Sequence, residues 1–396
     1  MKLATDALLG RIRQEDPESW HTVEDLLHYL PQWVHRADAA GDIDPSFWHG
    51  RPVEALNRMN MPVAYGGLAL TATALRRAVV FEIVGRVCAA LPMAMPGPGL
   101  AMPPVNALGT EAQRKAFFGR FVGQQRPVWG SFAITEPQGG SDATSMRTVA
   151  RREGDDYVLS GTKCFITGGR RADVVVVFAS IDPSKGRFGI RAFMVERGMP
   201  GFSVDRCEDM LGLRASQLAA LSFNEVRLPA VAMLGHDGKR GPFIDAFAGA
   251  QNAWDYMRPA LAAGINGSSR GVIDAAQAAL DRGEADLDAA AFEAAQDELE
   301  VLRARVHASQ LLALRAAWRF DEGQRVSTDA SMAKAHASTL AMDVAHRVAQ
   351  VFPLQATQSG HLFEKFYRDA KGFDILEGTG DMQRLMIARA HAPAMH

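Results

Sequence analysis

The stretch Trp129–Asp142, WGSFAITEPQGGSD, constrains this chain more than any other segment. Its apolar run Phe132–Ile134 is typical of a buried strand, and the Pro and Gly residues of 137–140 end that strand in a turn. Glycines let a backbone approach a ligand closely, and Ser141 adds a hydroxyl beside exposed amide groups. The stretch therefore fits a flat heterocycle on a strand end with a phosphate in the turn, although a plain loop between strands explains the local pattern equally well.

Two later segments accompany this stretch. Tyr157–Gly169, YVLSGTKCFITGG, precedes an apolar strand, and Asp374–Arg389, DILEGTGDMQRLMIAR, lies near the C-terminus. Together the three segments resemble the acyl-CoA dehydrogenase family of flavoproteins, in the same order and over nearly the whole chain. The resemblance implies FAD as cofactor and an oxidoreductase that acts on CH–CH groups, but membership of a fold family does not by itself fix the chemistry.

The composition is that of an ordinary globular protein with room for two or three domains. A formal net charge of -2 gives no electrostatic reason to expect nucleic acid or an anionic membrane as partner. Cys88, Cys164 and Cys207 are too far apart for a metal site or a disulfide framework, which indicates a reducing compartment. No apolar run is long enough to span a bilayer and the N-terminus has no signal-peptide core, so we expect a cytoplasmic protein.

The hydrophobic pattern changes twice along the chain. Apolar residues recur at helical spacing to about residue 125, and short runs rich in Val, Ile and Phe between Gly and Asp turns then continue to about residue 235. Three long Ala-rich amphipathic segments follow, at 257–281, 288–322 and 328–352. We predict an α+β fold of three domains: a helical N-terminal domain, 1–127; a middle β domain that is a mostly antiparallel sheet or small barrel, 128–236; and a C-terminal four-helix bundle, 237–396.

Glu377 is the candidate catalytic base. An acyl thioester has a weakly acidic C–H beside its carbonyl. Removal of that proton at neutral pH needs a positioned base and hydrogen-bond donors to the thioester oxygen. A carboxylate in a tight turn beside an apolar cavity has its pKa raised by desolvation. Taken alone, Glu377 also suits an exposed helix start. Some relatives place the base on an earlier helix, but the matching residue here is Met257, which cannot accept a proton.

The resemblance implies further contacts. For the cofactor these run from the flavin ring to the pyrophosphate: Phe132, Ile134, Thr135, Ser141, Phe165, Thr167 and Thr379. For the thioester oxygen, it implies donation from the Glu377 N–H and from a cofactor hydroxyl. Asp255 and Arg258 match positions that bind the pantetheine arm or support the active site. An intrahelical pair three residues apart explains these two charges equally well.

Two segments depart from the family pattern where the adenosine end of FAD is expected. The first segment reaches a neighbouring subunit's cofactor in the family, and only Arg282 of its motif remains here. In the second segment Gln350 remains, but two glycines are replaced by Pro353 and Leu354. Bulkier residues do not allow the same close backbone approach. We keep Arg282 and Gln350 as candidate cofactor residues, and expect FAD to bind there by different contacts or more weakly.

The leading hypothesis is FAD-dependent introduction of an α,β double bond into an acyl thioester. Whether the acyl group is carried on coenzyme A or on an acyl-carrier protein stays open. The sequence shows no dedicated basic cluster for the nucleotide of coenzyme A, which keeps an acyl-carrier protein as a serious variant. By resemblance we expect a homodimer or homotetramer and an electron-transfer flavoprotein as acceptor. Two alternatives stay open: a flavin-dependent oxygenase on the same fold, against which Glu377 argues, and a cofactor-poor binding or assembly subunit, which the Pro353–Leu354 change motivates.

Overall fold

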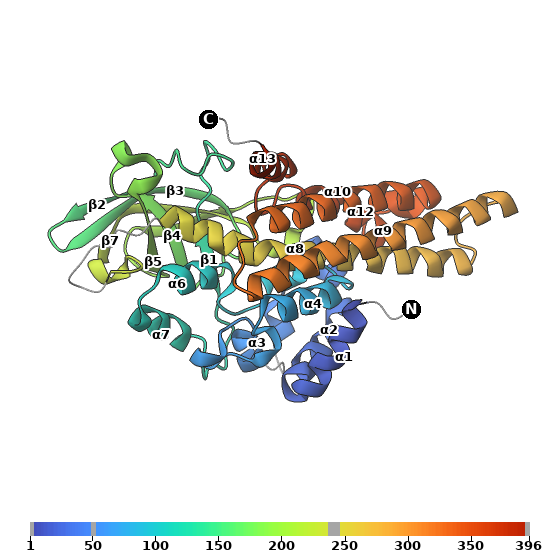
Figure 1. Ribbon diagram of the computed structural model, residues 1–396, viewed down its shortest axis with the longest axis horizontal. Helices are drawn as coiled ribbons and strands as arrows, with labels where there is room; N and C mark the ends of the chain where they lie inside the picture. The colour runs from blue at the N-terminus through green and yellow to red at the C-terminus, as the bar shows by residue number, and fades with distance from the viewer. Residues whose placement is uncertain (1–3, 49–52, 237–245, 393–396) are drawn as a thin grey trace.

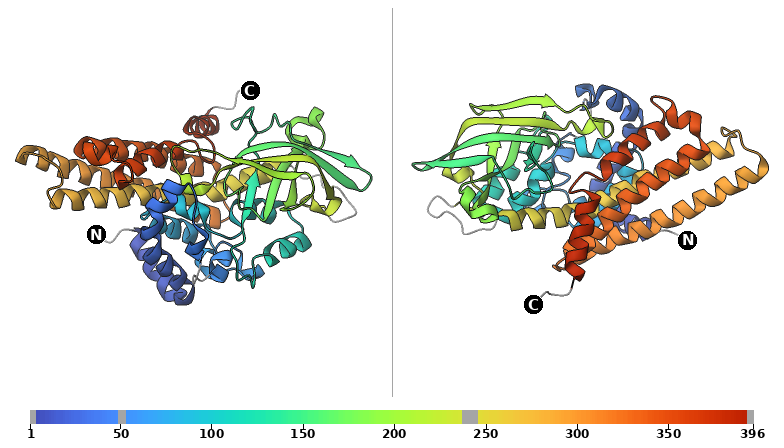
Figure 2. Two further views of the ribbon diagram at one scale, coloured as in Figure 1. Left: turned by 180° about the vertical axis from the view of Figure 1, so that it is seen from behind. Right: turned by 90° about the horizontal axis from the view of Figure 1, so that it is seen from above.

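The computed structural model describes residues 4–48, 53–236 and 246–392, so the start of the third predicted domain at residue 237 lies outside the described residues. A helical part, a curled sheet and a bundle of long helices follow one another along the chain (Figure 1). The bundle extends away from the sheet, as two further views also show (Figure 2). The predicted α+β fold with helical first and last parts is therefore confirmed.

The N-terminal part is built from α-helices: α1 (Ala4–Glu15), α2 (Pro17–Ala40), α3 (Val53–Arg58), α4 (Ala74–Gly85), α5 (Ala90–Ala94), α6 (Met102–Leu108) and α7 (Glu111–Gly119). Helix α4 is the one that reaches the candidate site. It begins after Thr73, whose hydroxyl accepts a hydrogen bond of 3.1 Å from the Arg76 N–H and so caps the helix. Most residues of α4 are buried, because the helix packs along the first helix of the bundle.

The middle part is a sheet of seven strands: β1 (Gly130–Ala133), β2 (Val149–Glu153), β3 (Asp156–Ile166), β4 (Val174–Ser180), β5 (Ile190–Glu196), β6 (Phe202–Cys207) and β7 (Ala219–Pro229). The strands pair in the order β1-β4-β2-β3-β7-β6, and β5 pairs with β4. Strand β1 is parallel to β4, β2 meets β4 through one parallel pair, and the other pairings are antiparallel. The prediction of a mostly antiparallel sheet is confirmed.

Strand β4 is the centre of this sheet because every one of its residues is buried. Its alternate side chains point to opposite faces, as in any strand. Val174, Val176 and Phe178 pack with α6 and the start of the following long helix. Val175 and Val177 pack inside the curl of the sheet. A continuous run of β-branched and aromatic residues suits a strand covered on both faces.

The C-terminal part contains the long helices α8 (Ala246–Asp281), α9 (Ala289–Asp321) and α10 (Ser327–Val351). The shorter helices α11 (Pro353–Thr357), α12 (Leu362–Phe373) and α13 (Gly380–His391) follow them. Helix α8 begins against the sheet and continues into the bundle, so it connects the two (Figure 1). Of the helices in the described ranges, none is both long and apolar enough to cross a bilayer.

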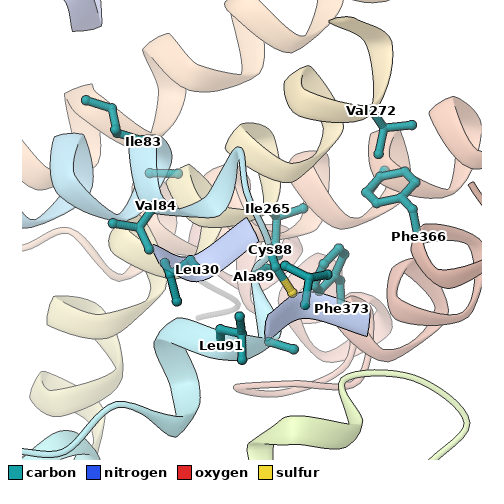
Figure 3. Close-up of a cluster of buried hydrophobic side chains, with 14 of the residues drawn as sticks. Leu30, Ile83, Val84, Cys88, Ala89, Leu91, Ile265, Val272, Phe366 and Phe373 are labelled. Atoms are coloured by element: carbon teal, nitrogen blue, oxygen red, sulfur yellow. The ribbon is translucent and has the colours of Figure 1, made fainter. Parts of the chain in front are cut away.

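Helices α4 and α8 approach each other closely because glycines lie at their contact. A Cβ atom at Gly267 would lie 2.0 Å from the Glu82 carbonyl oxygen, and one at Gly271 would lie 2.1 Å from that of Arg86. Larger residues have no room at these two positions. Beside the contact, Cys88 and apolar side chains of α2, α4, α8 and α12 form one buried cluster (Figure 3). The N-terminal helices are therefore fixed against the bundle.

Candidate active site

Glu377 lies in the turn between α12 and α13 in a left-handed backbone conformation. Its φ is 54° and that of Gly378 is 90°. For a residue with a side chain, this conformation costs about 1–2 kcal/mol, and it persists only where the surroundings fix it. Two side chains do so here: Arg258 Nε and Gln383 Nε2 each donate a hydrogen bond of 3.1 Å to the Glu377 carbonyl oxygen.

Lys334 fixes the same turn from α10. Its Nζ donates to the carbonyl oxygens of Asp374, at 2.7 Å, and Gly378, at 2.9 Å. The side chain is fully buried, and burial lowers the pKa of Lys334 to about 8. The sequence interpretation missed this residue. Lys334 follows Ala330 and Ala333 on the buried stripe of an amphipathic helix, and a charge at such a position is the signal that identifies it.

The environment of the Glu377 carboxyl group suits a base. Burial raises the pKa of Glu377, and the positive charges of Arg258 and Lys334 oppose the shift without cancelling it. Arg77 on α4 has the same, weaker effect. A carboxylate with a raised pKa accepts a proton more readily near neutral pH. Within the described ranges no acceptor pairs with the Glu377 N–H, which leaves that group available to a ligand oxygen.

Asp255 and Arg258 support the turn from α8, and both are buried. Arg258 Nη1 lies 3.7 Å from the Asp255 carboxylate, so the intrahelical pair exists. The same carboxylate accepts hydrogen bonds from Gln251 Nε2, at 2.9 Å, and from Ser327 Oγ. Arg258 also bonds to the backbone of Glu377. The two interpretations of this pair are therefore compatible, because the ion pair orients the arginine that holds the turn.

Trp254 links the turn to the sheet. Its ring centroid lies 6.4 Å from that of Phe132 on β1, and the Arg258 guanidinium lies 5.6 Å from the same indole ring. Aromatic and cation–π contacts at these distances are favourable. The strand end predicted to contact the flavin ring and the predicted base thus belong to one region of the molecule.

The ends of β1 and β3 lie side by side. The Cys164 N–H donates to the Thr135 carbonyl oxygen at 3.0 Å, and Ser131 Oγ donates to that of Thr167 at 2.8 Å. Phe165 lies where the pairing of β3 with β7 is irregular, and its φ is 55°. Although it is aromatic, 54% of its surface is exposed. An exposed ring held in a strained backbone is a typical binding feature.

A buried ion pair fixes this strand end. Lys163 Nζ donates to the Glu136 carboxylate at 2.8 Å and to the Ile134 carbonyl oxygen at 3.0 Å. The N–H groups of Arg147 and Thr148 donate to the same carboxylate, at 2.7 and 2.9 Å. Burial alone would raise the pKa of Glu136, but Lys163 and these hydrogen bonds lower it to about 2. The sequence interpretation missed this pair, since its members are far apart along the chain.

The remaining predicted cofactor residues differ in exposure. Ile134 is buried, Thr135 is half-buried, and Ser141 is exposed at the turn. Thr379 caps α13, where its hydroxyl accepts a hydrogen bond from the Met382 N–H at 3.3 Å. An exposed ring, a half-buried hydroxyl and an exposed turn along one strand end fit the flavin ring and the start of its pyrophosphate chain.

Arg282 and Gln350 lie elsewhere, at the far end of the bundle. Arg282 pairs with Glu284 at 2.6 Å, and Gln350 accepts a hydrogen bond of 3.4 Å from Arg347. Helix α8 rises about 42 Å between Trp254 and this end, at 1.5 Å per residue. One chain therefore does not bring these two residues to the predicted flavin site, and their role stays a prediction that involves a neighbouring subunit.

A basic pocket, which the sequence did not show, opens beside Asp255. It measures about 520 Å³, and its wall includes three arginines from distant segments: Arg187 between β4 and β5, Arg325 between α9 and α10, and Arg389 on α13. The sequence showed no basic cluster because these three arginines are far apart along the chain. Guanidinium groups pair well with phosphate oxygens, so this pocket is a candidate site for phosphate groups.

Comparisons with known proteins identify the family. The models for the N-terminal, middle and C-terminal domains of acyl-CoA dehydrogenase match residues 23–124, 131–226 and 247–392. A cyclohex-1-ene-1-carbonyl-CoA dehydrogenase of Geobacter metallireducens is 35% identical, over 83% of this chain and 85% of that protein.

Two solved structures have the same fold over nearly the whole chain. Butyryl-CoA dehydrogenase from Megasphaera elsdenii has a TM-score of 0.81 at 28% identity, and covers 96% of this chain and 97% of its own. A structure described as the electron transferring flavoprotein of Acidaminococcus fermentans has a TM-score of 0.82 at 28% identity, with 94% and 97% covered.

The fold and site define an oxidoreductase that acts on CH–CH groups of acyl-CoA. The chain belongs to the acyl-CoA dehydrogenase family. The cofactor of this family is FAD, and contact of Thr135 and Phe165 with its flavin ring stays a prediction. The family predicted from the sequence is confirmed.

Proposed function

We propose that the chain introduces an α,β double bond into an acyl thioester, with Glu377 as the base that removes the α proton. The observation that carries this proposal is the Glu377 turn, whose strained backbone is held by Arg258, Gln383 and Lys334. A turn fixed from three helices positions one carboxylate, and the same surroundings raise the pKa of that carboxylate.

Separate groups of the chain act on the α proton, on the thioester oxygen and on the cofactor. The Glu377 carboxylate takes the α proton, and the Glu377 N–H donates to the thioester oxygen, where negative charge develops. When bound, FAD accepts the hydride that leaves the β carbon. Phe165 and Thr135 orient the flavin ring, and Trp254 closes the space between strand β1 and Arg258. The fixed base and the exposed strand end favour this reaction over the cofactor-poor subunit and the oxygenase.

Coenzyme A is the thiol carrier that the basic pocket favours. Arg187, Arg325 and Arg389 line the same pocket as Asp255, which lies one helical turn from Arg258. A pantetheine arm that starts at the thioester therefore reaches these arginines with its phosphates. An acyl-carrier protein presents a single phosphate on this arm and coenzyme A presents three, so three arginines suit coenzyme A better.

Two partners complete the proposal. The electrons leave through an electron-transfer flavoprotein, which the likeness to the structure from Acidaminococcus fermentans supports. We propose a homodimer or homotetramer, because about 42 Å of α8 separates Trp254 from the end of the bundle where Arg282 and Gln350 lie. A second copy in a closed symmetric assembly brings them to the adenosine end.

Anaerobic mixing tests the proposal. The purified protein, loaded with FAD, is combined with a panel of saturated acyl-CoA thioesters and the corresponding acyl-carrier-protein thioesters, and the flavin absorbance is followed. We expect an acyl-CoA to bleach the flavin. A protein that cannot be reconstituted with FAD, or that no thioester bleaches, contradicts the proposal. Bleaching by carrier-protein thioesters alone contradicts the choice of carrier.

A further inference from the structure

Arg77 on α4 is a buried cation without a hydrogen-bond acceptor for two of its nitrogens. Only 2% of the residue is exposed, and within the described ranges neither Nε nor Nη1 has a partner. Lys163 and Lys334 differ, since each donates to oxygens. Arg258 also has a nitrogen without a partner, Nη1, but its Nε donates to the Glu377 carbonyl oxygen and Nη1 lies 3.7 Å from the Asp255 carboxylate. Burial of a charge whose donors lack acceptors destabilises the folded protein, so such a group is a candidate for ligand binding.

Two aromatic rings flank Arg77 but leave its donors free. Its guanidinium carbon lies 5.1 Å from the ring centroid of Phe81 and 5.0 Å from that of Tyr256 on α8. Cation–π contacts stabilise the charge, yet a ring face offers no oxygen for an N–H group. The close packing of α4 on α8 keeps the arginine in this place. The arrangement therefore retains the charge and leaves its hydrogen bonds to a ligand.

The position of Arg77 relates it to the acyl group. Its charge acts on the Glu377 carboxylate, so the guanidinium lies within electrostatic reach of the proposed base. It approaches from α4, whereas Arg258 approaches from α8. Tyr256, which lies against Arg77, also forms part of the wall of a cavity of about 320 Å³ between α6 and α8. Tyr256 therefore connects the wall of this cavity with Arg77, and Arg258, two residues further along α8, connects the same helix with the Glu377 turn.

We propose that Arg77 binds an oxygen acceptor on the acyl chain, best a carboxylate at its distal end, and so selects short dicarboxylic acyl thioesters. This inference rests on the proposed function and names its substrate class. Arginine presents several N–H donors in one plane and matches both oxygens of a carboxylate. A site built for such a group rejects the analogue that lacks it, because the buried donors are then left unpaired.

The test compares acyl-CoA pairs of equal chain length. Succinyl-CoA against butyryl-CoA, and glutaryl-CoA against pentanoyl-CoA, are assayed by flavin reduction and by calorimetric binding. We expect the wild-type protein to favour the dicarboxylic member by at least about tenfold in kcat/KM. Arg77→Met should remove that preference in both readouts. The control is Arg76→Met, since Arg76 pairs with Glu15 at the surface, and it should leave the preference unchanged.

The outcomes separate this inference from the proposed function. Reduction by butyryl-CoA with no preference for succinyl-CoA overturns the role of Arg77 and leaves the dehydrogenation standing. No reduction by any acyl-CoA overturns both. Equal losses on both substrates in Arg77→Met also overturn the inference. If Arg77→Met does not fold, Arg77→Lys keeps the charge, and a preference weakened by severalfold in that variant supports the role while an unchanged preference contradicts it.

Discussion

The two ends of helix α8 hold their charges in opposite ways. At the sheet end, Arg258 is buried, pairs with Asp255 and bonds to the Glu377 backbone. At the far end, Arg282 pairs with Glu284 at the surface, and Leu354 of the neighbouring α11 is 80% exposed. The family motifs are intact at the first end and replaced at the second.

This difference in burial separates a fixed arrangement of charges at the sheet end from an exposed arrangement at the far end. Buried charges with several partners fix a geometry, because removal of any one partner leaves another uncompensated. Exposed pairs fix little, since water and salt replace them. The sheet end therefore holds its charges in a fixed arrangement, as the proposed reaction requires, whereas the far end is an exposed surface for which we propose a role in a neighbouring subunit.

The largest difference between the two ends should appear in stability. Glu136→Gln leaves Lys163 buried without its counter-charge and should lower the free energy of unfolding by about 3–5 kcal/mol. The matched control is Glu284→Gln at the exposed end, which should cause no measurable change. Urea unfolding followed by circular dichroism measures both. Equal losses of stability in the two variants would contradict the proposed difference between the two ends of α8.

The same pair predicts an acid-sensitive sheet end. The pKa of Glu136 in the folded protein, about 2, lies below its ordinary value of 4.5. Its contribution to stability is therefore complete above pH 4.5 and declines as the pH falls toward 2. Over this range the wild-type protein should lose more stability than Glu136→Gln does. Parallel curves of stability against pH for the two proteins would contradict the lowered pKa of Glu136.

A smaller effect should follow from Lys334→Met, which removes the donor to Asp374 and Gly378. A base displaced by a fraction of an ångström should reduce flavin about 10–100-fold more slowly. Because a cation near Glu377 is also lost, the pKa of that carboxyl should rise, and the acid limb of the rate profile should move to higher pH. Stopped-flow reduction across the pH range measures both.

Lys371→Met, an exposed charge on α12, is the control for Lys334 and should leave the rate and the profile unchanged. A slower rate in Lys334→Met with an unshifted acid limb would mean that the lysine only supports the fold.

The smallest effect is expected at the far end. Leu354→Asp places a charge where the adenosine end of a neighbouring subunit's cofactor is expected. It should weaken FAD retention by no more than about tenfold, or ~1.4 kcal/mol. Ultrafiltration and flavin absorbance measure the retained fraction. Leu311→Asp on α9, also an exposed leucine, is the control. Identical retention in both variants would remove the far end from cofactor binding.

The sequence predicted the parts of this molecule that lie in continuous motifs. The three helical segments of the bundle, the strand end at Phe132–Ile134 and the turn with Glu377 each depend on neighbours in the chain, and local spacing identifies them. The raised pKa of Glu377 also followed from the expected burial.

The rest depends on pairs that only the fold brings together. Glu136 and Lys163 stand in two different motifs, and neither motif shows that the two side chains meet in the interior. Arg187, Arg325 and Arg389 come from three distant segments and form a basic pocket only in space. For Arg77 the missing information is that, among the described residues, two of its nitrogens have no acceptor, which no sequence pattern contains.

The central claim is that Glu377 is the base, and one measurement tests it most directly. Glu377→Gln keeps the size of the side chain but cannot take a proton, so we expect flavin reduction by an acyl-CoA substrate to slow by about 10³-fold or more. FAD content and acyl-CoA affinity should stay close to those of the wild-type protein. A variant that is fully loaded with FAD and reduces it within a few-fold of the wild-type rate would contradict the account.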